Sequence, residues 1–279
     1  MPRGYGGTYT AANGARVRVL LAESYGANDA LWRSWGEFLS RLPHGSELSS
    51  ALLDVVPPGD VVAACGGPSE DGCYDPNDGM LVVPGSPPPD GQSPAAIAAH
   101  EYGHHVAAHR SNSPWDAYDW GTKRWSSYED VCRRVRAGTA FPGDEARQYA
   151  RNPGEAFADA YRDLAGGGWS GRFDASFRPD AASLAALRED VEHPWRGPAI
   201  SIRTGRVAGH RRLSLGVTTL DGRASARLLS GSSPTVRLAR VGARSGSGGA
   251  RVSTTICGQD AFRLEVRGNG RYRLALRLP

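Results

Sequence analysis

The stretch Ser93-Pro-Ala-Ala-Ile-Ala-Ala-His-Glu-Tyr-Gly-His-His-Val-Ala-Ala-His-Arg110 is the segment around which the rest of the chain can be interpreted. Its flanks are rich in alanine and other apolar residues, so it predicts a largely buried helix. Ser93 can cap that helix, and Pro94 suits its first turn because a proline there gives up no hydrogen bond. His100 and His104 are four residues apart, so a helix places both imidazoles on one face, with Cβ atoms roughly 5–6 Å apart.

The pentapeptide His100-Glu-Tyr-Gly-His104 predicts a zinc site. Two imidazoles at this spacing can share one tetrahedral ion at about 2.0–2.1 Å. Glu101 lies beside them, where it can hold a water molecule without being a ligand, and this arrangement is typical of zinc metallopeptidases. The same pattern occurs by chance in unrelated chains, at helix ends or interfaces. Here the surrounding helix is Ala-rich, where an unpaired buried His or Glu is costly, so the context favours zinc.

A second segment offers the third ligand. One large group of zinc peptidases carries a further His six residues after the second, but Arg110 occupies that position here. The segment Asn152-Pro-Gly-Glu155-Ala-Phe-Ala-Asp159 begins like a helix, with Asn152 as its N-cap. Glu155 would complete a His2Glu site, and Asp159, one turn later, could bind the outer nitrogen of a ligating His. Taken alone, this segment is an ordinary surface helix with a solvated acid.

These two motifs, in this order, resemble those of the gluzincin zinc peptidases, and the pattern is similar to that of the anthrax lethal factor catalytic domain and its relatives. The resemblance covers roughly residues 15–195. It implies a zincin-like fold and an endopeptidase that acts on protein or peptide substrates, with Zn2+ as its cofactor. The ligands would be His100, His104 and Glu155, and Glu101 would be the general base.

The resemblance also implies a tyrosine that stabilises the transition state. In lethal-factor-like members it precedes the ligand Glu by a few residues, so Tyr149 is the candidate. Tyr161 is the reserve, and either tyrosine could equally belong to the core. In thermolysin-like members an Asp one turn after the third ligand supports a ligating histidine, a role that Asp159 would take.

The hydrophobic pattern predicts the remaining elements of a first domain over residues 15–196. The Gly-rich segment 1–14 is expected to be loose. Strands are predicted over residues 15–25, 51–56, 61–65 and 79–85, and helices over residues 28–42, 127–136, 152–165 and from 180 onward. Pro84 favours an edge position for its strand, and the resemblance implies that an edge strand there lines the cleft and pairs with extended substrate.

The hydrophobic period changes to two beyond residues 194–198, which predicts a second domain over residues 197–279. Its strands are expected over residues 212–217, 225–229, 236–241, 251–256, 262–266 and 272–278. Residues 267–271, Arg-Gly-Asn-Gly-Arg, predict a hairpin turn. Many short strands favour a β-sandwich. The expected fold class is therefore α+β, a zincin-like metallopeptidase domain followed by a small all-β sandwich, similar in shape to the accessory domains of exported bacterial peptidases.

Charge is divided unequally between the two predicted domains. Residues 197–279 contain 15 Arg, no Lys and three acidic residues, a net charge of +12. The whole chain is +4, which leaves −8 for residues 1–196. A basic module could hold the protein on an anionic cell surface, or the Arg residues could simply solvate the outer faces of the strands. Nucleic acid is not an expected partner because stacking aromatics are not interleaved with the basic strands.

The cysteines indicate an oxidising compartment. Cys65 and Cys73 enclose a loop of turn-forming residues, which predicts a local disulfide. Cys132 is either a core thiol or the partner of Cys257, tying the domains together. No apolar run is long enough for a membrane helix, and the start lacks the apolar core of a signal peptide. The expected location is therefore extracellular, with a secretion signal absent from this sequence.

Two other functions stay open at this point. The chain could be a non-catalytic exported protein with structural zinc, in which the basic domain binds a surface. Glu101 argues against this, since a structural site needs no base. It could also be a latent or single-target peptidase whose Gly-rich start, residues 1–14, fills the cleft.

Overall fold

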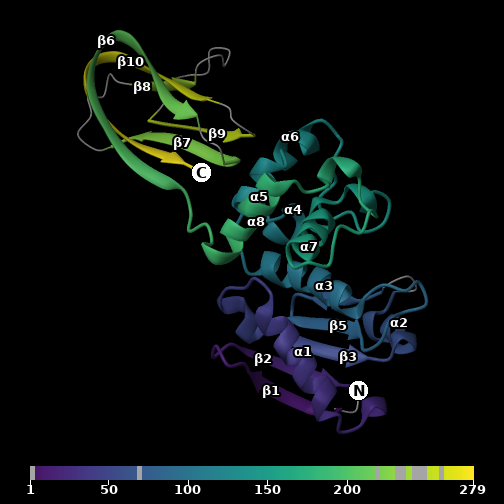
Figure 1. Ribbon diagram of the computed structural model, residues 1–279. Helices are drawn as coiled ribbons and strands as arrows, with labels where there is room; N and C mark the ends of the chain where they lie inside the picture. Colours follow the sequence, from purple (N-terminus) through teal and green to yellow (C-terminus); the bar gives the residue numbers. More distant parts are fainter. Residues whose placement is uncertain (1–3, 68–70, 218–219, 230–236, 241–249, 258–260) are drawn as a thin grey trace.

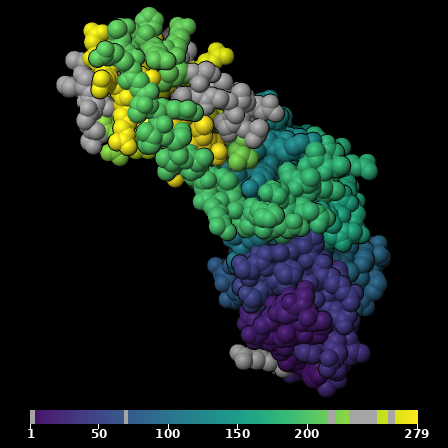
Figure 2. Space-filling model, turned by 60° about the vertical axis from the view of Figure 1, so that its left-hand side comes forward, coloured from purple at the N-terminus to yellow at the C-terminus, as the bar shows by residue number. Residues whose placement is uncertain are grey.

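The computed structural model describes residues 4–67, 71–217, 220–229, 237–240, 250–257 and 261–279 (Figure 1). Within these residues the fold is mixed α+β, with two β-sheets at opposite ends of the molecule and a group of helices between them (Figure 1). The space-filling view shows the same order on the surface, from the N-terminal sheet to the C-terminal one (Figure 2).

The N-terminal sheet has the strand order β1-β2-β3-β5-β4. Its bounds are β1 Gly6–Thr10, β2 Arg16–Leu21, β3 Leu52–Val56, β4 Cys73–Asp75 and β5 Met80–Pro84. Strands β2, β3 and β5 run parallel, and the two outer strands are antiparallel to their neighbours. In β2 the apolar residues alternate with arginines, which keeps one face buried. Helix α1, Asp29–Arg41, packs against β1 and β2.

Two secondary-structure predictions for the N-terminal part of the chain were wrong. Gly6–Thr10, expected to be loose, form β1, and they do so at the edge farthest from β4. Residues 6–10 therefore do not fill a cleft near β4, while residues 1–3 lie outside the described part of the chain. Val61–Cys65, expected to be a strand, form helix α2 instead. A five-residue apolar run does not distinguish the two, and here a turn at Pro58–Asp60 starts the helix and Gly66 ends it with φ 80°.

The expected position of the strand before the motif helix was also wrong. Strand β5 lies inside the sheet, between β3 and β4, and β4 is the edge strand. Pro84 pairs with Val56 of β3, whereas β4 covers only residues 80–82 of β5. The missing N–H of Pro84 therefore faces no strand on the β4 side, so proline is tolerated in an interior strand.

The middle of the molecule is helical. The helices are α3 Pro94–Ala108, α4 Ala117–Trp120, α5 Lys123–Tyr128, α6 Val131–Arg136, α7 Pro153–Leu164 and α8 Ala181–Glu192. Helix α3 packs on β5 and β4 with one side and on α7 with another. Of the two predicted N-caps, Asn152 accepts a hydrogen bond from Gly154 N, but the side chain of Ser93 makes no capping hydrogen bond. Asp180, which precedes α8, accepts from Ala182 N. The helix predicted over residues 127–136 is interrupted at Asp130, whose φ is 54°.

The C-terminal sheet contains β6 Ala199–Val217, β7 Gly222–Leu228, β8 Arg237–Arg240, β9 Arg251–Ile256 and β10 Ala261–Leu278. Its order is β6-β10-β7-β9, and β8 also pairs with β10. Strands β6 and β10 are long and curved (Figure 1). The sheet has a hydrophobic cluster separate from that of the first domain. Because all the described strands within residues 197–279 belong to one sheet, the predicted pair of facing sheets is not confirmed.

The predicted hairpin over residues 267–271 was wrong. Gly268 and Gly270 lie within β10 and pair with Gly209 and Val207 of β6 in an uninterrupted antiparallel ladder. Asn269 Oδ1 accepts a hydrogen bond from Gly209 N, 3.0 Å away. Gly-Asn-Gly suits a bend in a long strand as well as a turn, and β6 offers partners on both sides of it. The terminal residues of the strand predicted over 236–241 lie outside the described residues.

Two disulfides are present. Cys65 pairs with Cys73 as expected, with Cα atoms 5.8 Å apart. Cys132 of α6 pairs with Cys257, which follows β9, so the alternative that tied the two parts together is the one observed. Beside this link, Asp221 N donates to Ser127 Oγ at 2.8 Å. The disulfides are consistent with an extracellular protein. Among the described residues, every helix is too short or too polar to cross a bilayer.

Candidate metal centre and cleft

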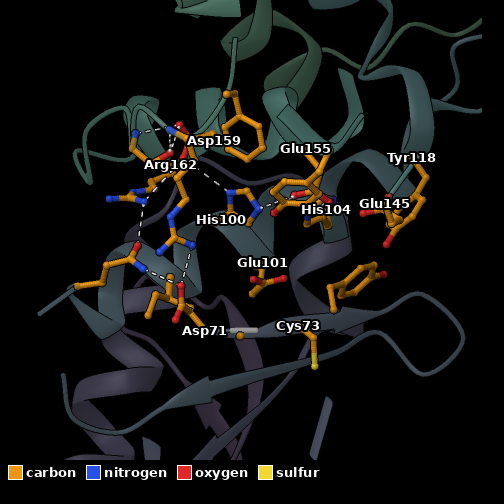
Figure 3. Close-up of a pocket in the computed structure, with 18 of the residues that line it drawn as sticks. Asp71, Cys73, His100, Glu101, His104, Tyr118, Glu145, Glu155, Asp159 and Arg162 are labelled. Atoms are coloured by element: carbon orange, nitrogen blue, oxygen red, sulfur yellow. Dashed lines mark hydrogen bonds and ion pairs between the residues drawn. The ribbon is translucent and has the colours of Figure 1, made fainter. Parts of the chain in front are cut away.

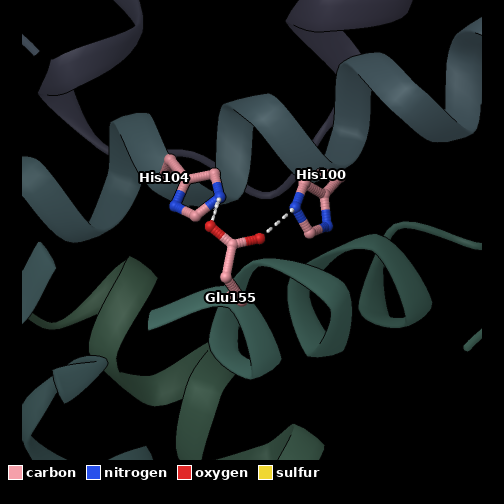
Figure 4. A group of neighbouring side chains, drawn as sticks. All are labelled: His100, His104 and Glu155. Atoms are coloured by element: carbon pink, nitrogen blue, oxygen red, sulfur yellow. Dashed lines mark hydrogen bonds and ion pairs between the residues drawn. The ribbon is translucent and has the colours of Figure 1, made fainter. Parts of the chain in front are cut away.

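The site forms where helices α3 and α7 pass closest to each other. Gly103 of α3 faces Ala158 of α7, and a Cβ atom built on Gly103 would lie 2.8 Å from Ala158 Cα and 3.0 Å from Tyr161 Cβ. Without a side chain at this position the two backbones can approach closely. The approach brings the two motifs together, because His100 and His104 lie on the α3 side of it and Glu155 on the α7 side (Figure 4).

His100, His104 and Glu155 converge on one point. Each imidazole Nε2 is 3.3 Å from a carboxylate oxygen of Glu155, and one ligand atom from each residue lies within 4.8 Å of the others (Figure 4). Ligands at about 2.0–2.1 Å from a tetrahedral ion are themselves about 3.3–3.4 Å apart. The three side chains are largely buried. The group therefore could hold a metal ion.

The electrostatics of the group favour a cation. Burial alone would lower the pKa of His100, but contacts with Asp159 and Glu155 outweigh it and raise that pKa to about 10. Burial would raise the pKa of Glu155, yet His104 and His100 together hold it well below its usual range. A positive charge, carried by a proton or a metal, is thus stabilised at the centre of the three side chains.

Asp159 lies behind His100, but the predicted hydrogen bond between them is not formed. Its Oδ1 is 3.8 Å from His100 Nδ1, an ion-pair distance longer than a hydrogen bond. Its Oδ2 accepts hydrogen bonds from the backbone N and the hydroxyl of Ser170, at 2.9 and 3.0 Å. The carboxylate is fully buried, so these contacts fix its position behind the imidazole.

The other predicted site residues also lie here, and the two candidate tyrosines are distinguished. Glu101 lines the same cleft and is mostly buried (Figure 3). The hydroxyl of Tyr149 donates to Glu155 Oε2 at 2.8 Å. Tyr161 is a core residue whose hydroxyl donates to the carbonyl of Pro43, away from the metal centre.

A cleft of about 580 Å³ surrounds the centre (Figure 3). On the His100 side, Arg172 pairs with Asp71 at 2.7 Å, and Phe173 stacks on the His100 ring. On the His104 side lie Tyr118, Glu145 and Tyr74 of the edge strand β4. The aromatic segment 111–123 had left open whether Tyr118 rims a cleft or packs in the fold, and Tyr118 does line the cleft. The sequence motifs did not indicate the other residues, because most lie in loops or short elements without a periodic pattern.

Glu145 stands at the mouth of the cleft beside the ligand helix. Its Oε1 accepts a hydrogen bond from Asn152 Nδ2 at 2.9 Å, and Asn152 also caps α7. Partial burial and the neighbouring Glu155 raise the pKa of Glu145 to about 7. The first turn of α7 thereby positions two acids, Glu155 at the metal centre and Glu145 at the cleft wall.

His105 links the back of α3 to the cleft. Its Nε2 lies 2.9 Å from the carbonyl oxygen of Glu47, which can only accept, so Nε2 carries the proton. Its Nδ1 is therefore an acceptor, and the Tyr74 hydroxyl, 3.2 Å away, donates to it. Burial lowers the pKa of His105 to about 4, which keeps the ring neutral. The hydroxyl proton of Tyr74 is thus bound by His105 Nδ1.

Comparison with known proteins finds no protein-family model that matches the chain and no curated protein sequence that matches it. The function is therefore inferred from the chemistry of the site.

Proposed function

We propose that this protein is a zinc-dependent endopeptidase of the gluzincin type, with a zincin-like domain, exported from the cell. The observation that carries the proposal is the convergence of His100, His104 and Glu155 within 4.8 Å, in a cleft that Glu101 also lines. Two imidazoles and a carboxylate form a donor set that suits Zn2+. A purely structural zinc site is usually closed by four protein ligands, whereas three ligands in an open cleft leave a position for substrate chemistry.

Zn2+ held by these three residues would polarise a peptide carbonyl and lower the pKa of a water molecule. Glu101, from the same helix turn as His100, would take the proton of the attacking water and deliver it to the leaving amine. Tyr149, whose hydroxyl donates to Glu155 Oε2 in this structure, would release that bond and donate the same proton to the carbonyl oxygen as negative charge develops there. Asp159 would hold the His100 ring in one orientation, since its Oδ1 faces Nδ1 at 3.8 Å.

The edge of the N-terminal sheet suits an extended peptide. Strand β4, Cys73–Asp75, is the outer strand, and Cys73 and Tyr74 line the cleft. A substrate chain paired with this edge would gain backbone hydrogen bonds and run past the metal centre. The substrates expected for such an edge are therefore unfolded proteins or peptides.

The test compares the parent protein with Glu101→Gln on an unfolded protein mixture, reading new chain termini by mass spectrometry. The parent should produce new termini that a chelator abolishes, while Glu101→Gln should bind zinc but produce none. Glu37→Gln is the matched control, because Glu37 is an exposed acid on α1 that pairs with Arg41. Cleavage by Glu101→Gln at the parental rate would refute the assignment of the base.

Metal content provides a second, independent measurement. Glu155→Ala should lose zinc, because two histidines remain for an ion that requires at least three protein ligands. His193→Ala is a suitable control, since His193 is 69% exposed and follows α8. Full zinc occupancy in Glu155→Ala would contradict the proposed third ligand.

An alternative function is favoured by one feature of the C-terminal sheet. Arg227 lies directly opposite Arg251, and Arg206 opposite Arg271, and all four are exposed. Like charges opposite each other destabilise a sheet, so their presence suggests an anionic ligand such as a cell-surface polymer. A non-catalytic, surface-binding protein with zinc would bind zinc and an anionic surface yet cleave nothing in the assay above.

A further inference from the structure

The wall of the cleft beside His104 differs in chemistry from the wall beside His100. Figure 3 shows Tyr118 and Glu145 on the His104 side, and Arg162 and Asp71 on the opposite side. The arginines of the cleft are matched by acids: Arg172 contacts Asp71 at 2.7 Å, and Arg162 lies 3.7 Å from Asp159. The His100 side is therefore internally compensated.

Glu145 has no such counterpart. Among the described residues, no Arg, Lys or His lies within ion-pair distance of it; it accepts a hydrogen bond from the neutral amide of Asn152, and the charges that act on it most strongly are those of Glu155 and His104. That bond uses only Oε1 and holds the carboxylate against the ligand helix, at the mouth of the cleft. A carboxylate that lacks an ion-pair partner among the described residues, next to the point where a substrate would be cleaved, can bind a basic side chain.

Aromatic rings continue this wall. Tyr118 lies with its ring centre 5.5 Å from that of His104 and 6.2 Å from that of Tyr74. Aromatic faces attract ammonium and guanidinium groups, and they also cover the apolar stem of a long side chain. Tyr74 lines the cleft beside Tyr118 and extends this aromatic wall.

From these features we propose that Glu145, Tyr118 and Tyr74 form a specificity subsite for a Lys or Arg side chain of the substrate, within two residues of the cleaved bond. This inference rests on the proposed peptidase function and names the substrate class of that site. The carboxylate of Glu145 would bind the cationic group, and the rings of Tyr118 and Tyr74 would cover the stem.

The first test is the cleavage profile of the zinc-loaded protein on an unfolded protein mixture. Lys and Arg should be enriched at one fixed position near the cleaved bond. Glu145→Gln should reduce that enrichment about tenfold, the effect of replacing a charged hydrogen-bond partner with a neutral one. The variant keeps the amide oxygen that accepts from Asn152 Nδ2, so the α7 cap is preserved. Glu145→Arg should shift the preference at the same position towards Asp and Glu.

Glu37→Gln serves as the control and should keep the parental profile, since Glu37 lies on α1 outside the cleft. A profile without Lys or Arg enrichment, or one unchanged in Glu145→Gln, would overturn the subsite while leaving the peptidase assignment intact.

A second test needs no turnover and therefore separates the two proposals. Zinc-loaded Glu101→Gln is titrated with a short blocked peptide containing one Arg and with the same peptide containing norleucine. The Arg peptide should bind about tenfold more tightly than the norleucine peptide. This difference in affinity should disappear in the double variant that carries both Glu101→Gln and Glu145→Gln. Equal binding of the two peptides would overturn the subsite. Absence of cleavage by the parent would refute only the peptidase function, since the binding comparison would still decide the subsite.

Discussion

The close approach of the two motif helices provides the sharpest prediction, made with the change Gly103→Ala. The added methyl would lie 2.8 Å from Ala158 Cα and 3.1 Å from Ala158 O, whereas ordinary contacts of a Cβ atom begin at 3.4 Å. Both atoms belong to the backbone of α7, so no side-chain rotation relieves the overlap. Helix α7 must therefore move away from α3 by roughly 0.6 Å.

Such a movement separates Glu155 from the histidines. Metal–ligand distances tolerate deviations of only about 0.2 Å, so a shift of this size should weaken zinc binding about tenfold or more. The stability effect has two opposing parts. Alanine in place of glycine favours a helix by up to about 1 kcal/mol, whereas overpacking costs about 1–3 kcal/mol. Because the overlap is with backbone, we expect a net loss of about 1–2 kcal/mol in the free energy of unfolding.

Zinc affinity is measured by competition with a chromophoric chelator, and stability by denaturant unfolding of the metal-free protein. Gly59→Ala is the matched control, because a Cβ atom there meets nothing within 4 Å and the backbone has no positive φ. It should leave zinc affinity unchanged and stability equal or slightly higher. Parental zinc affinity in a folded Gly103→Ala protein would refute the reasoning that this contact sets the distance between the ligand helices.

Further predictions concern groups around the site. Asp159→Asn should weaken zinc binding about 10–100-fold by chelator competition, because a neutral amide no longer orients the ligating histidine; unchanged affinity would contradict that role. His105 has a folded pKa of about 4 against about 6.5 when unfolded, so the unfolded chain binds the extra proton between these values. The contribution of the neutral His105 ring to the free energy of unfolding is therefore complete above pH 6.5 and is lost as the pH falls towards 4, by about 3 kcal/mol. His105→Gln should make the free energy of unfolding less dependent on pH when it is measured at pH 7 and at pH 4.5. A parallel loss in the variant would rule out His105 as the cause. Cys132→Ser should lower the free energy of unfolding by about 2–5 kcal/mol, and equal stability of parent and variant would contradict a structural role for that disulfide.

Local signals were sufficient for the elements that carry the ligands. The helical spacing of His100 and His104, the capping residue Asn152 and the four-residue spacing of Glu155 and Asp159 depend only on neighbours in sequence. Helices α3 and α7 therefore begin where they were predicted to begin. The same local reasoning failed at Val61–Cys65 and at residues 267–271, because short apolar runs and Gly-Asn-Gly segments suit more than one structure. The strand partners available in the fold decided between them.

The sequence by itself thus determined which residue types could meet at a metal and the helices on which they lie, because periodicity and capping are properties of adjacent residues. Only the tertiary structure decided that Gly103 lets these helices approach, that Tyr149 rather than Tyr161 faces Glu155, and that Glu145 and Tyr118 form one wall of the cleft. These relations join residues from separate elements and loops, and no local pattern encodes them. They follow from the packing of one element on another, which the whole chain specifies.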